Sequence, residues 1–155
     1  MNAVAAETIS EDRPTTAPER QKAAAASAKP DGRERAILCA RIAADYRGRD
    51  VQVLDLTKIV EWVDYLVIAT GSSRRQIVAA ADEIDRVMAE LGDKKYGVEG
   101  YEQGGWVVLD YGDVLIHLFD DEKREYYQLE TLWDDAPRVP WERPVDETAA
   151  ESEPA

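Results

Sequence analysis

The sequence has only one cysteine and one histidine, Cys39 and His117, among 155 residues. A single cysteine excludes a disulfide within the chain, and the two residues cannot supply the ligand cluster of a zinc site. Cys39 lies in an apolar pattern of helical period, where a free cysteine behaves as a small hydrophobic residue. We therefore expect Cys39 to be buried, and we expect neither a bound metal nor a cofactor.

Long apolar runs are also missing from the sequence. No stretch approaches the roughly 18 apolar residues that a membrane-spanning helix requires. The N-terminal segment lacks the apolar centre of a signal peptide, and it carries acids such as Glu7 and Glu11 that mitochondrial transit peptides avoid. These absences predict no association with a membrane and a cytoplasmic location.

Basic residues are few. The chain has 19 Lys and Arg against 32 Asp and Glu, which gives a formal net charge of −13. Proteins that bind free nucleic acid neutralise its phosphates with Lys and Arg. The basic runs here are no longer than pairs such as Lys94-Lys95 and Arg74-Arg75. The charge therefore argues against direct binding of free nucleic acid and favours a protein or small-molecule partner.

Two terminal segments lack the apolar periodicity of a folded domain. Residues 1–30 are rich in Ala, Thr, Pro and Glu, and residues 136–155 carry four prolines and five acids. Such compositions cannot bury enough apolar surface to offset the entropy lost on ordering. We predict disordered tails at 1–30 and 136–155 around one domain at 31–135, with Trp141 as a candidate for local docking.

The first half of the domain predicts a helix, two strands and a second helix. Asp31 can cap a helix that ends at Gly48, and strands are expected at 51–56 and 64–70. The second strand is apolar throughout, which is typical of a central strand buried on both faces. The expected inner stripe of the first helix is Leu38, Ile42 and Tyr46.

The second helix has a clear start and a clear inner face. Ser73 and Gln76 fit a capping box. The apolar residues that recur at helical spacing are Ile77, Ala81, Ile84, Met88 and Leu91. A short strand near 95–100, a hairpin and one or two short helices in 121–134 follow. This order predicts an α/β (α+β) fold, with a mixed sheet flanked by helices.

The hairpin at 105–119 is the most apolar stretch of the chain, and Gly112-Asp113 is a strong two-residue turn signal. Pairing outward from this turn produces one wholly apolar face. The opposite face carries Trp106 with Phe119, Val108 with His117, and Asp110 with Leu115. Two interpretations of this second face remain open. It is either a core face beneath a helix or a protein-binding patch anchored by the tryptophan.

Four segments of the domain resemble one known family. The segments DYLVIATGSSRRQ, GVEG, WVVLDYGDVLIHLF and REYYQLETLW occur in the order and spacing of the ribosomal silencing factor family RsfS, also called the Iojap-like family. The resemblance covers roughly residues 33–134. It implies a mixed five-stranded sheet flanked by helices, with the topology of nucleotidyltransferases.

The resemblance also implies a function. Members of the family bind the large ribosomal subunit through ribosomal protein uL14 and block joining of the small subunit, which represses translation under nutrient limitation. Carried over to this chain, the partner-binding residues are Trp106, Val107, His117 and Leu118. The alternation of the hairpin puts the first and third on one face and the other two on the opposite face. A homodimer formed through the same hairpin would compete with ribosome binding.

A nucleotidyltransferase-like, nucleotide-binding enzyme is the alternative. The segment TGSSRRQ leads from a strand into a helix N-terminus, which can bind an anion. Phosphoryl-transfer chemistry also needs carboxylates that converge on magnesium ions. Asp110 and Asp113 straddle the hairpin turn and do not share a face, and Asp120-Asp121 is better explained as a helix cap. We therefore expect a protein without enzymatic activity.

Overall fold

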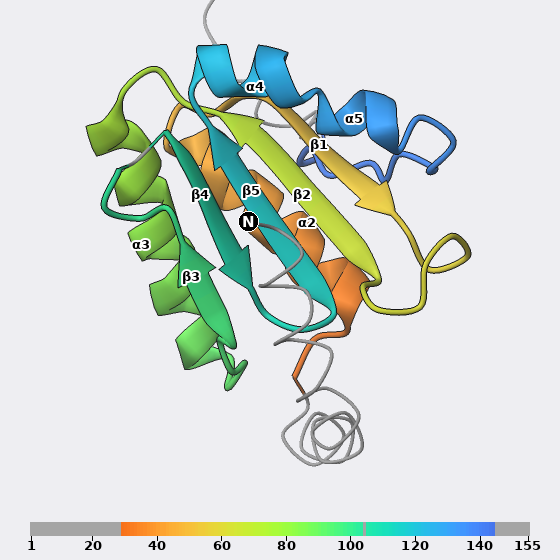
Figure 1. Cartoon of the computed structure of the whole chain (residues 1–155). Helices are drawn as coiled ribbons and strands as arrows, with labels where there is room; N and C mark the ends of the chain where they lie inside the picture. Colours follow the sequence, from red (N-terminus) through yellow and green to blue (C-terminus); the bar gives the residue numbers. More distant parts are fainter. Residues whose placement is uncertain (1–28, 104, 145–155) are drawn as a thin grey trace, which may run out of the picture.

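The computed structural model describes residues 29–103 and 105–144, which form a five-stranded sheet and its helices (Figure 1). The disorder predicted for residues 1–28 and 145–155 concerns segments outside this part of the chain. The elements in order are α2 (Gly32–Asp45), β1 (Arg49–Asp55), β2 (Tyr65–Thr70), α3 (Arg74–Glu90), β3 (Gly97–Glu99), β4 (Trp106–Asp110), β5 (Val114–Phe119), α4 (Asp121–Tyr127) and α5 (Leu129–Leu132).

The sheet is mixed, as the sequence predicts. Its strand order is β1-β2-β5-β4-β3. β2 and β5 run parallel, whereas β1–β2, β4–β5 and β3–β4 are antiparallel pairs. β2, β5 and β4 are the inner strands of this order, and the inner position of β2 explains why the run from Leu66 to Thr70 is buried. None of the described helices is long and apolar enough to cross a membrane.

Each face of the sheet has its own hydrophobic core. Helices α2 and α3 cover one face, seen behind the strands in Figure 1. The capping box of α3 forms as predicted, because Ser73 Oγ accepts the Gln76 N–H at 3.1 Å and Gln76 Oε1 accepts the Ser72 N–H at 2.6 Å. The predicted inner face of α3 is confirmed, with Ile84 and Met88 fully buried.

The inner stripe predicted for α2 is wrong in part. Ile42 is buried, but Leu38 is only half-buried and Tyr46 lies beyond the helix at 37% exposure. The residues that face the sheet are mostly small ones, namely Ala36, Cys39, Ala40 and Ala43. Small side chains let the helix backbone approach the strands closely, so the larger residues lie at the margins. Cys39 is fully buried as expected, and this burial raises the pKa of its thiol.

The folded unit extends past residue 135, where the sequence predicted a tail. Ala136 and Val139 are 4% and 5% exposed, and Val139 belongs to the core beneath the helices. The segment 136–144 packs along β1, and Trp141 docks locally as expected. Its prolines suggested disorder, yet prolines are tolerated in an extended segment at the edge of a sheet.

Candidate protein-binding face

The hairpin of β4 and β5 forms in the predicted register. Trp106 pairs with Phe119, Val108 with His117, and Asp110 with Leu115. The Tyr111 N–H donates to the Val114 carbonyl at 3.0 Å to close the turn. Gly112 has φ +89°, a left-handed conformation that glycine adopts without strain. The two faces of the hairpin are therefore those read from the alternation of the sequence.

Val107 and Leu118, two of the four residues expected to contact a partner, lie in the core beneath α2 and α3. Their exposed fractions are 0% and 3%. They pair with each other across the hairpin, next to Leu109 and Ile116 on the same apolar face. The helices cover these side chains, so the structure places them in the core and not on an exposed face.

Trp106 and His117 lie together on the opposite face. The indole Nε1–H of Trp106 donates to His117 Nδ1 at 2.9 Å, which places the proton of the neutral imidazole on Nε2. Trp106 is 9% exposed, and His117 is partly exposed. The indole packs in a core, as one interpretation of this face expects, while the pair also borders the surface, so a protein-binding role stays a prediction.

Aromatic rings connect this pair to the surface of α4. The Trp106 ring lies 5.1 Å from Phe119 and 4.3 Å from Tyr127, measured between ring centroids. Tyr126 contacts Tyr127 edge-on at 4.9 Å. The exposed fractions of Tyr127 and Tyr126 are 40% and 78%. These contacts form a continuous aromatic cluster from the sheet to solvent, with one stacked, one tilted and one edge-on pair.

A row of side chains extends this face across the sheet. The strand registers align Glu99, Val108, His117, Ile68 and Gln52 side by side on β3, β4, β5, β2 and β1. The side chains of Val108 and His117 are partly exposed near the middle of this row. We call the surface formed by Val108, His117, Trp106, Tyr127 and Tyr126 the hairpin face.

Burial of His117 lowers the pKa of its imidazole to about 4, from an ordinary value near 6.5. The unfolded chain therefore binds a proton between these two values that the folded protein does not. The free energy of unfolding should fall as the pH drops below about 6.5, until the folded imidazole also titrates. Protonation at Nδ1 would also remove the acceptor of the Trp106 hydrogen bond.

We expect a loss of about 1–2 kcal/mol between pH 7.5 and pH 5, less than full burial would imply because the ring is partly exposed. Urea unfolding curves at the two pH values measure this difference. A His117→Gln variant should show a smaller dependence on pH. Equal dependence in both proteins would contradict the assignment of the effect to His117.

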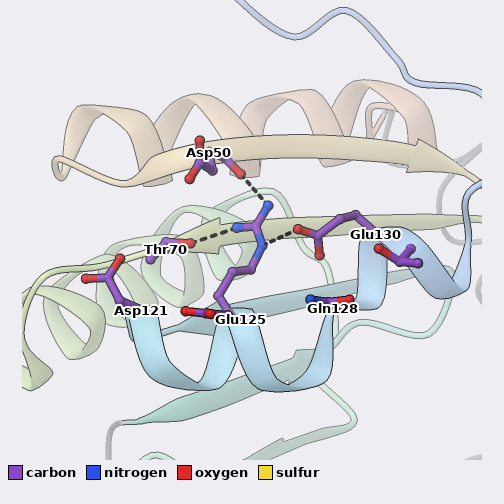
Figure 2. A pocket seen from close by; sticks show the side chains of 8 residues that line it. Asp50, Thr70, Asp121, Glu125, Gln128 and Glu130 are labelled. Atoms are coloured by element: carbon purple, nitrogen blue, oxygen red, sulfur yellow. Dashed lines mark hydrogen bonds and ion pairs between the residues drawn. The ribbon is translucent and has the colours of Figure 1, made fainter.

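A polar cavity of about 350 Å³ lies between α4, α5 and the strands (Figure 2). The buried guanidinium of Arg124 bridges these elements. It donates to Thr70 Oγ1 and the Asp50 carbonyl at 2.8 Å each, and to Glu130 Oε2 at 3.0 Å. Arg124 therefore holds α4 and α5 against the sheet and fixes Tyr127 over Trp106.

Two N–H groups at the helix N-terminus considered for a nucleotide-binding enzyme are bound by contacts within the chain. The N–H groups of Ser72 and Gln76 are bound by the capping box described above. Gly71 is explained by packing, since a Cβ there would lie 2.6 Å from Ile77 Cγ1. Within residues 29–103 and 105–144, no three His, Cys, Asp or Glu side chains are grouped to hold a metal ion.

Sequence reasoning did not identify Tyr126 and Tyr127 as parts of the hairpin face, or Arg124 as the residue that holds α4 in place. Their segment, REYYQLETLW, carried the family resemblance, but its periodicity indicated only a short helix. The adjacent tyrosines were the available signal. Two aromatic side chains in one turn of a short helix cannot both point to the core, so at least one had to be exposed.

Comparison with known proteins gives consistent matches over this domain. A ribosomal silencing factor RsfS of Halalkalibacterium halodurans is 41% identical over 95 residues, which are 61% of this chain and 81% of that protein. The mouse protein named mitochondrial assembly of ribosomal large subunit protein 1 is 33% identical over 88 residues, which cover 55% of this chain and 39% of its own length.

A solved structure and a family model extend these matches. A crystal structure of a Chromobacterium violaceum protein superposes with a TM-score of 0.65 at 32% identity, covering 75% of this chain and 92% of that one. The model of the family described as ribosomal silencing factor during starvation matches residues 11–155. The chain therefore belongs to the RsfS family of ribosomal silencing factors.

Proposed function

We propose that this protein binds the large ribosomal subunit through ribosomal protein uL14 and blocks joining of the small subunit, so that translation falls when nutrients are limiting. Membership of the silencing-factor family carries the proposal. The name of the mouse relative supports the large subunit as the partner. The proposed site of action is the cytoplasm, where free subunits meet.

The hairpin face is the surface that we assign to the contact. It exposes the edge of an aromatic cluster that is anchored in a core, which is the arrangement of side chains that dominate binding at many interfaces. Tyr126 is the most exposed of the large apolar side chains in the described part of the chain, at 78%. Trp106 and His117 contribute from the sheet, whereas Val107 and Leu118 support the hairpin from beneath. Self-association through this face would compete with binding to the ribosome.

Charge favours the same class of partner. The protein carries a net charge of −13, and α4 presents Asp121, Glu122 and Glu125 beside the aromatic cluster. Ribosomal proteins are generally basic, so complementary charge would speed their encounter with this surface and select against wrong partners. The proposed activity is steric and requires no bond to be made or broken.

Light scattering during mixing of purified subunits tests the proposal. Saturating protein should slow and reduce the rise in scattering, and sedimentation should recover the protein with large but not small subunits. Unchanged joining at saturation would refute the proposed block. Calorimetric titration with a nucleotide and magnesium tests the enzymatic alternative, and we expect no binding heat.

A matched pair of variants tests the assigned face. Val108→Glu places a charge in the middle of the hairpin face and should weaken binding by at least about tenfold, which is 1.4 kcal/mol. Val98 is 40% exposed and points to the opposite face of the sheet, because it pairs with Leu109. Val98→Glu should therefore bind normally. If both folded variants bind equally well, the contact lies elsewhere.

A further inference from the structure

The outer edge of β1 is covered by the segment that follows α5. β1 ends the strand order and pairs on one side with β2. An uncovered edge strand offers free N–H and C=O groups to which another chain can add a strand. The edge at β1 could therefore accept a strand from another chain if it were uncovered. The residues that pack on this edge determine whether such strand addition is possible.

Residues 137–143, which we call the strap, lie along this edge and pair with it through an isolated antiparallel bridge. The Asp55 N–H donates to the Pro137 carbonyl at 2.9 Å, and the Val139 N–H donates to the Val53 carbonyl at 2.8 Å. Leu54 and Arg138 form the β-bridge between these two hydrogen bonds. The strap thus uses main-chain groups, and its position on β1 is defined to a single residue.

Side chains fix the strap to the sheet and to α2. Val139 is 5% exposed and packs into the core beneath the helices. The Trp141 indole Nε1–H donates to the Val51 carbonyl at 3.0 Å, and Arg41 Nε on α2 donates to the Trp141 carbonyl at 2.7 Å.

A bidentate ion pair lies at the end of the strap. Both terminal nitrogens of Arg143 contact the carboxylate of Asp45 at 2.9 Å. Asp45 is the last residue of α2, so the pair ties the end of the strap to the end of that helix.

The outer side of the strap is a poor template for a further strand. In the antiparallel register, residues 137 and 139 direct their main-chain groups to β1, and residues 138 and 140 direct theirs away. Proline at 140 has no N–H, and position 138 carries the charged Arg138. Prolines and charges at an edge are features by which proteins prevent edge-to-edge association.

We propose that the strap is an intramolecular ligand of a strand-docking site on β1 and α2, and that its binding seals the sheet edge against strand addition. The site accepts an extended segment with valine and tryptophan two residues apart, followed by an arginine. This inference does not depend on the proposed ribosomal function, because it concerns a different edge of the sheet from the hairpin face.

Hydrogen exchange of the full-length protein tests whether the strap covers the edge of β1. Trp141→Ala should raise the exchange rate of the Asp55 amide by about tenfold or more, while the Ile68 amide at the centre of the sheet changes little. Glu142→Ala, which keeps the main-chain contacts and removes an exposed side chain, should leave both rates unchanged. Equal acceleration of both amides in Trp141→Ala would show general destabilisation and overturn the proposal.

A peptide tests whether the site on β1 and α2 can bind a separate strand. A fluorescent peptide of residues 135–144 should bind Trp141→Ala, whose site is weakly occupied, and should not bind the wild type. A scrambled peptide should bind neither. Arg143→Ala removes only a solvent-exposed ion pair, so it should leave the Asp55 exchange rate close to that of the wild type. Absence of peptide binding to Trp141→Ala would refute a specific docking site.

Discussion

Replacement of Trp106 by alanine should lower the free energy of unfolding by about 3–5 kcal/mol, the cost usual for deleting a buried aromatic side chain. The indole is 9% exposed and packs against Phe119 and Tyr127. Its loss also leaves His117 Nδ1 without the donor at 2.9 Å. The sequence left a core role and an interface role open, and the burial of the ring now predicts the behaviour of a core residue.

Tyr126→Ala is the matched control for this change. It deletes an aromatic ring of the same cluster that is 78% exposed, so stability should change by no more than about 0.5 kcal/mol. Urea unfolding of both variants provides the comparison. A Trp106→Ala protein that unfolds at the wild-type urea concentration would show that the indole contributes surface and not core.

The same measurements separate stability from binding. Trp106→Phe keeps an aromatic ring in the core but loses the indole N–H and part of the exposed edge. If this folded variant binds large subunits like the wild type, the interface depends on Tyr126 and Tyr127 and not on Trp106. Reduced binding with nearly unchanged stability would support the contribution of Trp106 to the hairpin face.

The hairpin could be predicted from the sequence because its signals are local. A Gly-Asp turn and alternating side chains determine both the register and the two faces, and the structure has both as expected. The capping box and the apolar stripe of α3 are equally local, since the contacts that decide them are four residues apart or fewer. Patterns of this range do not depend on the rest of the chain.

The wholly apolar hairpin face indicated a covered face, but whether the opposite face is core or surface could not be read in the same way. Both faces carry apolar residues, and alternation separates two faces without ranking them. The family resemblance assigned Val107 and Leu118 to the contact, but the structure covers them with α2 and α3. Which face is more deeply buried depends on where the helices pack, and that is a property of the whole fold.

The contacts of the strap and of Arg124 were inaccessible to sequence reasoning for a different reason. Trp141 contacts β1 at a separation of 90 residues, and Arg124 reaches Thr70 across 54. The composition of residues 136–155 indicated disorder because it has few apolar residues. Two apolar residues of this segment, Val139 and Trp141, pack against the core and hold the strap in place. Hydrogen bonds to the edge of the sheet supply its other contacts.

Replacement of Arg35 by methionine should also destabilise the protein by about 3–5 kcal/mol. The Arg35 side chain is 4% exposed and forms ion pairs with Asp93 and Asp113. The Asp93 side chain is completely buried, and it also pairs with Lys29 at 3.3 Å. Removing the guanidinium takes away a positive charge that offsets the carboxylates in a site with little water. The resulting loss of stability is larger than the stability that the intact ion pairs contribute.

Two further variants distinguish a buried ionic network from simple loss of packing. Neutralising the partners as well, in Arg35→Met with Asp93→Asn and Asp113→Asn, should recover part of the lost stability, because it removes the uncompensated charge. Arg86→Met is the surface control. Its ion pairs with Glu83 and Glu90 are exposed on α3, where water already solvates the charges, so its unfolding curve should match the wild type. If the triple variant is no more stable than Arg35→Met alone, the cost arises from the lost contacts of the arginine stem, and the carboxylates of Asp93 and Asp113 tolerate their positions without the guanidinium.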